Sequence, residues 1–421
     1  MVETLRTRTR PSGKKPATCG GLRRTSRRLP NLDRFGRTTK CRVEKSTKPV
    51  VHGRREILPR VKPGDGVIPQ NRIPVVDATG RPLMPCLAGR ARRLLDGGKA
   101  VGARNKLGIF YIRLKVEKKP GNQLLVVGID PGSKFEGFSV VGTKDTVLNL
   151  MSEAPDWVKR AVRTRKDARR DRRFRHCRRR ECRVDNRMTG KSRLPPSTKS
   201  RWDAKLRIVS KLKETIPLTH AVVEDIKTMT RENGKHWNVH FSPMEIGKNY
   251  LYRGLRAIGL EVSLKGGMET KEARDKLGLK KTKSKSKPVF ESHCVDAWVL
   301  ARSISGANSP TTKDLYYLTP LRWHRRQLHM FEPSKGGKRR RYGGTVSLGF
   351  KRGTLFRHKR YGLCYVGGCM DEKLSLHSNV TGKRLSQKVS ISEMKILTRI
   401  TNRVQFIPDS ESGIYTRREK L

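Results

Sequence analysis

Acidic residues are scarce in this sequence of 421 residues. There are 37 Asp and Glu against 96 Lys and Arg, which leaves a formal net charge of +59. An ordinary metabolic enzyme mixes both signs on its surface and keeps its net charge small, so the composition excludes that class. A charge excess of this size requires a polyanionic partner, and nucleic acid is the usual one.

Long apolar runs are also absent. Apolar residues make up 34% of the chain and aromatic residues 6%, which suffices for several modest cores but not for one large core. No run approaches the length of a membrane helix, and the first residues lack the apolar core of a secretory signal. We therefore expect no membrane partner and a cytoplasmic protein.

The eight cysteines form neither a disulfide framework nor a pair of CxxC motifs, which fits a reducing compartment. Cys177 and Cys182, like Cys364 and Cys369, are five residues apart. This spacing permits zinc ligation, although buried or incidental cysteines are the more common reason for it.

Residues 1–72 hold 20 basic and 5 acidic residues and show no lasting hydrophobic period. Such a segment is predicted to be disordered when free. Three interpretations stay open: an arm that binds nucleic acid without sequence preference, a dispensable extension, or a start codon assigned too early.

Order is predicted from residue 73 onward. Strands at 73–76 and 109–116 flank a helix at 87–95, which suggests a small βαβ-like unit. The apolar run 124–130 is typical of a central strand and ends in a carboxylate. Strands at 135–141 and 146–150 follow so closely that the three must form an antiparallel meander.

Residues 157–183 interrupt this pattern with 14 basic and 3 acidic residues and no Pro or Gly. Arginine is a good helix former, so we predict one long helix. Its arginines cover every face and cannot pack on an apolar core, whereas the planar guanidinium suits phosphate. A solvated charged helix is the alternative. The predicted nucleic-acid-binding residues are Arg160, Arg163, Arg165, Arg169, Arg170, Arg172, Arg173, Arg175, Arg178, Arg179 and Arg180.

Helices and strands alternate again between 196 and 309, and short strands with glycine turns follow from about 310. Basic clusters fall in these turns. We expect Arg339, Arg340, Arg341, Lys351 and Arg352 to bind nucleic acid as well.

Four residues of the middle region are candidates for chemistry. Asp130 ends the central strand, Glu224 lies in the apolar strand 219–226, and His293 and Asp296 share one face of a helix. If the two strands are parallel neighbours, the carboxylates meet at one sheet end. Each residue has a simpler interpretation: a turn cap for Asp130, replacement by Asp225 for Glu224, and an ordinary buried histidine for His293. Their conjunction is the stronger signal.

Several carboxylates gathered in one place require neutralising cations. Oxygen ligands in a phosphate-binding protein favour Mg²⁺ or Mn²⁺, and two such ions activate water and stabilise the leaving oxygen of a phosphodiester. We therefore expect two ions, held by Asp130, Glu224 and Asp296. His293 beside them is either a ligand or a proton-transfer group.

These motifs resemble those of the IscB/IsrB family of transposon-encoded, RNA-guided (OMEGA) nucleases over residues 73–407. Arg81-Pro82-Leu83-Met84-Pro85 contains the motif that names the family's PLMP domain, and the arginine helix resembles its RRXRR bridge helix. Gly128-Ile129-Asp130-Pro131-Gly132, Val222-Val223-Glu224 and His293-Cys294-Val295-Asp296 resemble the three RuvC motifs.

The resemblance implies an α/β fold with an RNase H-like (RuvC) nuclease core. It divides the chain into a basic extension (1–72), a PLMP domain (73–120), RuvC-like segment I (121–156), a bridge helix with its loop (157–195), segments II and III (196–309) and a basic β-rich domain that reads a motif beside the target (310–421).

Only 68 residues separate Glu224 from His293, which leaves no room for an inserted HNH nuclease. His236-Trp237-Asn238-Val239-His240 superficially offers the His and Asn of an HNH site, but the ββα-metal pattern that should follow is missing. The sequence is therefore most similar to IsrB, the branch that lacks HNH. This implies a nickase that binds a non-coding ωRNA, one protein per RNA, and cuts the displaced strand of double-stranded target DNA.

Three other functions remain open at this stage. An unguided RuvC-like junction endonuclease would need no RNA. A non-cleaving RNA-guided DNA-binding protein would not need the four candidate residues. A purely structural RNA-binding protein would explain the charge but not the order of the carboxylates.

Overall fold

The computed structural model describes residues 72–119, 121, 123–175, 194–225, 243–322, 331–332, 337–338, 346–370 and 372–409. The predictions for residues 1–71, Arg178–Arg180, Arg339–Arg341, Cys177, Cys182, His236 and His240 fall outside these residues. Within the described part of the chain, no helix combines the length and apolar character that crossing a membrane requires.

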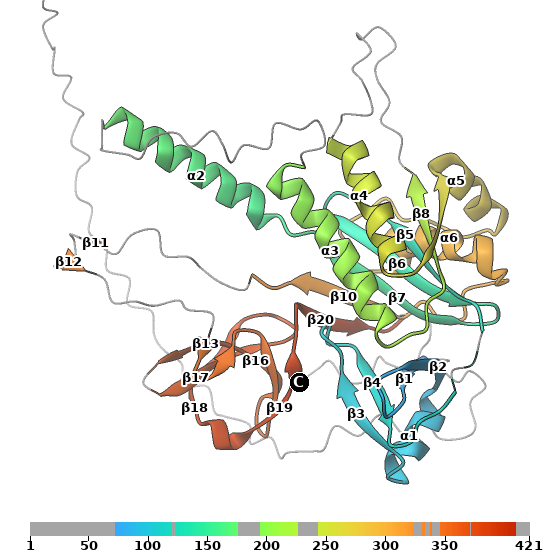
Figure 1. Cartoon of the computed structure of the whole chain (residues 1–421), viewed down its shortest axis with the longest axis horizontal. Helices are drawn as coiled ribbons and strands as arrows, with labels where there is room; N and C mark the ends of the chain where they lie inside the picture. The colour runs from blue at the N-terminus through green and yellow to red at the C-terminus, as the bar shows by residue number, and fades with distance from the viewer. Residues whose placement is uncertain are drawn as a thin grey trace, which may run out of the picture. The chain divides into compact units, whose positions relative to one another are not determined.

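The largest sheet has seven strands in the order β20-β10-β7-β6-β5-β8-β9 (Figure 1). Its strands are β5 (Leu125–Asp130), β6 (Phe135–Gly142), β7 (Thr146–Glu153), β8 (His220–Asp225), β9 (Glu261–Gly266), β10 (Leu315–Pro320) and β20 (Asn402–Ile407). The predicted meander of β5, β6 and β7 is confirmed. β8 runs parallel to β5, and β9 runs parallel to β8. The chain is therefore a mixed α/β protein, as predicted.

Helices cover both faces of this sheet. On one face lie α3 (Pro196–Lys213) and α4 (Pro243–Ala257). On the other lie the π-helical turn η2 (Phe290–Cys294) and α6 (Val295–Ser305), with α5 (Gly267–Lys276) packed against α6. Burial on both faces explains why β5 is continuously apolar in sequence.

Side-chain alternation along β5 decides which face each residue serves. Val127 and Ile129 join the core under α3 and α4, whereas Val126 joins the core under α6. Asp130 is an even number of residues from Val126 and therefore faces α6.

Two glycines allow the close approach of α6 and η2 to the sheet. A Cβ atom on Gly128 would lie 1.8 Å from the carbonyl oxygen of Ala297, and one on Gly137 would lie 2.2 Å from that of His293. No side chain fits at either place, so these glycines set the height of the α6 layer above the sheet.

A separate four-stranded sheet lies N-terminal to the central one, in the order β2-β1-β4-β3. Its elements are β1 (Arg72–Val76), β2 (Pro82–Leu87), α1 (Ala88–Asp96), β3 (Ala100–Arg104) and β4 (Phe110–Leu114). β1 and β4 are parallel, which agrees with the predicted βαβ-like unit. The PLMP motif lies in β2, a strand that the sequence pattern did not indicate.

The C-terminal region forms a five-stranded antiparallel sheet in the order β18-β17-β16-β15-β19. Its strands are β15 (Thr354–His358), β16 (Gly362–Met370), β17 (Lys373–Ser378), β18 (Arg384–Val389) and β19 (Met394–Arg399). Two short hairpins, β11 (Phe331–Glu332) with β12 (Gly337–Lys338) and β13 (Val346–Ser347) with β14 (Phe350–Lys351), precede it, and the 3-10 turn η4 (Ile391–Glu393) precedes β19.

This β-rich region is inserted between two paired strands of the central sheet. β10 and β20 are antiparallel neighbours, and Pro320 at the end of β10 lies opposite Asn402 at the start of β20. Residues 310–421, which the sequence suggests as one β-rich domain, thus also supply two strands to the seven-stranded sheet.

Candidate active site

The parallel pairing of β5 and β8 brings two carboxylates to one end of the sheet. Ile129 lies opposite Val223, so Asp130 and Glu224 are the next residues of adjacent strands. Both point toward the α6 side. Val126, four residues before Asp130, and Val222, two residues before Glu224, belong to the core under α6, and residues an even number apart share one face of a strand. Asp130 is buried and Glu224 is half-buried.

His293 is brought to Asp130 by the π-helical turn η2. Its Nδ1 lies 3.0 Å from Oδ2 of Asp130, and its Nε2 lies 3.2 Å from the carbonyl oxygen of Lys285. Both partners are acceptors, so the ring donates to both only when it carries two protons. π-Helical turns are frequent at functional sites because they displace a side chain from the regular helical position.

Asp296 is the fourth residue and lies in the first turn of α6. It is only 2% exposed. Arg274 donates from Nη1 to its Oδ1 at 2.7 Å, and Lys281 donates to its Oδ2. Both carboxylate oxygens of Asp296 are therefore engaged by cations from α5 and the loop that follows α5.

The surroundings of Glu224 shift the pKa of its carboxyl group. Burial, the most important cause, raises the pKa of Glu224 from 4.5 to about 7, aided by the nearby charge of Asp130, a hydrogen bond with Asp130 and the charge of Asp296. The charge of Lys281 opposes the increase in this pKa. Asp130 and Asp296 are thus close enough to Glu224 for their charges to act on it.

A divalent cation suits this set of donors in part. Asp130 and Glu224 offer oxygens from adjacent strands, which are ligands that a divalent cation accepts. Burial, and after it the charges of Asp130 and Asp296, raise the pKa of Glu224, and a bound cation would oppose these effects. In the described residues, however, no three His, Cys, Asp or Glu side chains are gathered as a metal-binding group. Both oxygens of the third carboxylate, Asp296, are held by Arg274 and Lys281.

The pKa of Glu224 leads to a first prediction, for the metal-free protein. Between pH 4.5 and 7 the folded state holds a proton that the unfolded state has released, so stability falls as pH rises through this window. Glu224→Gln removes the ionisable group and with it this loss of stability at high pH. At pH 8 with EDTA it should raise the free energy of unfolding by about 2 kcal/mol, with no gain near pH 4.5.

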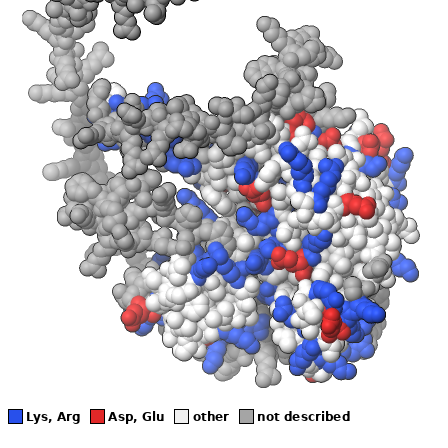
Figure 2. All heavy atoms as spheres, in the orientation of Figure 1, with Lys and Arg blue, Asp and Glu red and all other residues white. Residues whose placement is uncertain are grey.

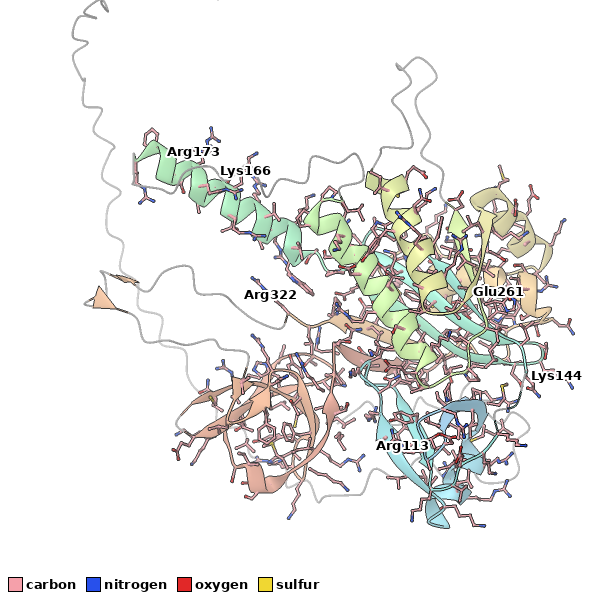
Figure 3. The ribbon with its side chains drawn as sticks, in the orientation of Figure 1. Arg113, Lys144, Lys166, Arg173, Glu261 and Arg322 are labelled. Carbon is pink, nitrogen blue, oxygen red and sulfur yellow. The ribbon has the colours of Figure 1, made fainter. Side chains whose placement is uncertain are left out.

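Chemical denaturation at the two pH values measures this difference. Glu261→Gln, on the exposed end of the neighbouring strand β9 (labelled in Figure 3), is the control and should change little at either pH. A Glu224→Gln variant less stable than the parent at pH 8 would contradict the prediction.

Asp225, the competitor of Glu224, faces the opposite way. It accepts hydrogen bonds from Lys248 at 2.6 Å and from Tyr252 at 3.0 Å, both on α4. Its role is to fix the end of β8 against α4. The strand alternation therefore separates the two neighbouring acids onto opposite faces of the sheet.

Sequence reasoning missed Arg274 and Lys281, which have no signal of their own among 96 basic residues. It also missed a buried ion pair on the other face of the sheet, where Lys205 of α3 contacts Glu136 of β6 at 2.6 Å. Burial raises the pKa of Glu136 and the charge of Lys205 lowers it. This pair fixes β6 to α3.

The predicted arginine helix is present as α2 (Trp157–Phe174), and its predicted continuation to 183 lies largely outside the described residues. Arg163, Arg165, Arg169, Arg170, Arg173 and Arg175 are exposed, as is Arg160, which pairs with Asp156. Arg172 lies in the helix. The side chains, among them the labelled Lys166 and Arg173, extend from the helix in several directions (Figure 3). Among the described side chains of residues 166–174, none is buried.

Basic side chains also gather on the two smaller sheets. Figure 2 shows them over α1 and its sheet. There a hollow of about 940 Å³ is walled by apolar residues such as Leu83 and Leu114. Seven cations line it, with no Asp or Glu among its described lining residues: Arg72, Arg90, Arg93, Lys99, Lys115, Lys118 and Lys119. In the C-terminal region Lys351 is exposed and Arg352 is half-buried.

The cysteine pair that the structure describes shows no zinc site. Cys364 is buried and its thiol pKa is raised to about 11 by burial, whereas Cys369 is exposed. Both are free.

Comparison with known proteins gives two kinds of likeness. Residues 73–238 match the family model described as RRXRR protein. Two solved structures of RuvC from Thermus thermophilus are similar, each with a TM-score of 0.24: one in complex with a Holliday junction substrate (17% identity, covering 42% of this chain and 90% of that chain) and one of RuvC by itself (16%, 42% and 91%). A comparison with curated proteins gives no match.

Proposed function

We propose that this protein is an RNA-guided DNA endonuclease with one metal-dependent, RuvC-like site that nicks the displaced strand. The observation that carries the proposal is the pair of carboxylates Asp130 and Glu224 on adjacent parallel strands, with His293 at 3.0 Å from Asp130. The charge of Asp296 acts on the same pair through Glu224. The order β7-β6-β5-β8-β9, with only β6 antiparallel to the rest, supports an RNase H-like core.

In this proposal Asp130, Glu224 and Asp296 hold the cations, Mg²⁺ or Mn²⁺. Bound there, two such ions would supply the activation of a water and the stabilisation of the leaving oxygen of a phosphodiester. His293 orients Asp130 through its Nδ1 proton, and the carbonyl of Lys285 fixes the ring. The burial of Asp130 and Asp296 keeps bulk water from competing for their oxygens.

Guidance by an ωRNA is supported by the RRXRR match and by the exposed arginines of α2. Their guanidinium groups would bind the phosphates of the RNA and of the guide–target duplex by shape, while base pairing selects the sequence. The cation-lined hollow beside the PLMP motif offers a further phosphate-binding surface. One protein would bind one RNA, and the complex would associate with the nucleoid when on DNA.

RNA that copurifies with the protein tests the guidance directly. Expressed with its own flanking non-coding DNA, the chain should retain one dominant structured RNA with a variable guide segment. Sequencing of the bound RNA would instead contradict guidance if it gave fragments of cellular RNA in proportion to their abundance.

The arginine helix gives a second prediction. Replacing Arg169, Arg170, Arg172 and Arg173 by Glu should weaken RNA binding and reduce the slope of log K against log salt by roughly 3, because each lost phosphate contact removes about 0.7 to 0.9. Filter binding across a salt series measures both. The charge-matched control replaces the exposed Arg253, Arg256, Lys271 and Lys276 by Glu and should change the slope far less. Equal slopes in the two variants would contradict a phosphate-binding role of α2.

The β-rich insertion would read the motif beside the target, with Lys351 and Arg352 among its contacts. A third prediction uses the pairing of Pro320 with Asn402: residues 322–400 can be replaced by an Asn-Gly turn that keeps β10 and β20. This variant should bind the guide RNA but lose its preference for flanking bases by at least about tenfold. A randomised-flank selection measures it, and an unchanged preference would exclude the insertion as the reader.

A further inference from the structure

The carboxylate of Asp296 is already paired with two cations that differ in exposure. Arg274, on α5, has a side chain that is 13% exposed, and its Nη2 also lies 3.5 Å from Asp275. Lys281, on the loop after α5, has a side chain that is 31% exposed. A divalent ion that uses Asp296 must displace one of them.

The backbone of this loop is fixed against the turn that carries His293. The N–H of Thr282 donates to the carbonyl of Glu291 at 3.0 Å. Ser292 donates from its hydroxyl to the carbonyl of Lys287 at 2.7 Å. The lysines of the loop nevertheless remain exposed, namely Lys280, Lys281, Lys283, Lys285 and Lys287. The movable part is therefore the flexible lysine stem.

The ammonium group of Lys281 forms an ion pair with Oδ2 of Asp296, the oxygen that Arg274 leaves free. A cation placed in this way performs the electrostatic part of a metal ion's role, since it neutralises carboxylates that would otherwise repel each other.

We propose that Lys281 is a tethered cation that occupies the metal position at Asp296 until a divalent ion displaces it. The inference rests on the proposed function, because it takes Asp130, Glu224 and Asp296 as the metal ligands. Lys281 rather than Arg274 leaves, because it is more exposed and has a flexible stem that ends in a compact charge, whereas Arg274 is held in the helix and by a second acid. The folded site thus tolerates low metal concentrations, at the expense of metal affinity.

Titration of the RNA-free, full-length chain with Mn²⁺, followed by the electron paramagnetic resonance signal of free Mn²⁺, tests the proposal. Lys281→Met should bind Mn²⁺ about tenfold more tightly than the parent, the ratio that corresponds to 1.4 kcal/mol. Lys280→Met removes the same charge from the adjacent exposed position and should leave the affinity within about twofold of the parent.

Two further measurements separate competition from a general structural role. In an Asp296→Asn background, Lys281→Met should give no additional gain, since the shared ligand is gone. Without metal, Lys281→Met should unfold at a lower temperature than Lys280→Met, and saturating Mn²⁺ should remove that difference. A merely structural lysine would lower the unfolding temperature equally with and without Mn²⁺.

The outcomes distinguish this inference from the proposed function. Equal Mn²⁺ affinity in the parent, Lys281→Met and Lys280→Met would overturn the role of Lys281 alone. Absence of Mn²⁺ binding in the parent and in every variant would overturn the metal site itself, and the inference with it. Binding by Lys281→Met where the parent binds weakly or not at all supports both.

Discussion

Asp130→Asn, Glu224→Gln and Asp296→Asn should each reduce DNA cleavage by about a thousandfold or more, which corresponds to a loss of about 4 kcal/mol of transition-state stabilisation. Each change removes one carboxylate from the group at the end of β5 and β8. Binding of RNA and target should persist, because loss of a negative charge beside phosphate does not weaken the attraction. Single-turnover cleavage and filter binding on the same preparations measure both quantities.

Asp225→Asn is the matched control for this series. It changes an adjacent acid of the same strand, but one that faces α4 through Lys248 and Tyr252. Provided that thermal unfolding shows a folded protein, its cleavage rate should stay within about threefold of the parent. A variant at Asp130 that still cleaves at the parent's rate would exclude the proposed site.

Gly128→Ala should lower the free energy of unfolding more than any other glycine-to-alanine change in the central sheet. The new Cβ would lie 1.8 Å from the carbonyl oxygen of Ala297 and 2.8 Å from the backbone nitrogen of Ala301. Both neighbours are backbone atoms of α6, so the whole helix must move. We expect a loss of about 3 kcal/mol or more in the free energy of unfolding, with loss of cleavage because η2 and Asp296 move with α6.

Gly89→Ala is the control for this prediction. Gly89 lies in α1, and a Cβ atom there meets nothing within 4 Å. Alanine should be neutral or slightly stabilising at that position. Chemical denaturation compares the two variants with the parent, and a Gly128→Ala protein of parental stability would show that α6 does not approach β5 as closely as described.

Strands β5, β6 and β7 of the central sheet were predictable because their signals are local. The apolar run of β5 and the short connections of β5, β6 and β7 determine an antiparallel meander without reference to distant residues. The pairing of β10 with β7 and β20 was not predictable, because it joins segments that are more than 80 residues apart. The sequence of residues 404–407 predicts a strand, but no local feature indicates which sheet that strand joins.

Some residues of the candidate site were likewise predictable from the sequence, and others were not. Asp130 and Glu224 could be predicted to meet, because parallel strands align their carboxyl ends and alternation fixes the face. The π-helical turn at His293 could not be predicted, because η2 packs closely against Gly137, a residue far away in the sequence. Arg274 and Lys281 could not be chosen from sequence either, since any of the many cations could have paired with Asp296.

Strand-specific end-labelling tests the central claim most directly. The purified complex of protein and RNA, given Mg²⁺ and a duplex that matches the guide, should nick only the displaced strand, and neither the RNA-free protein nor Asp130→Ala should cut. Cutting of both strands would reveal a second active site. Cleavage of a branched junction without RNA would show an unguided endonuclease. Tight, guide-dependent binding without any nick would show a protein that recognises DNA but does not cut it.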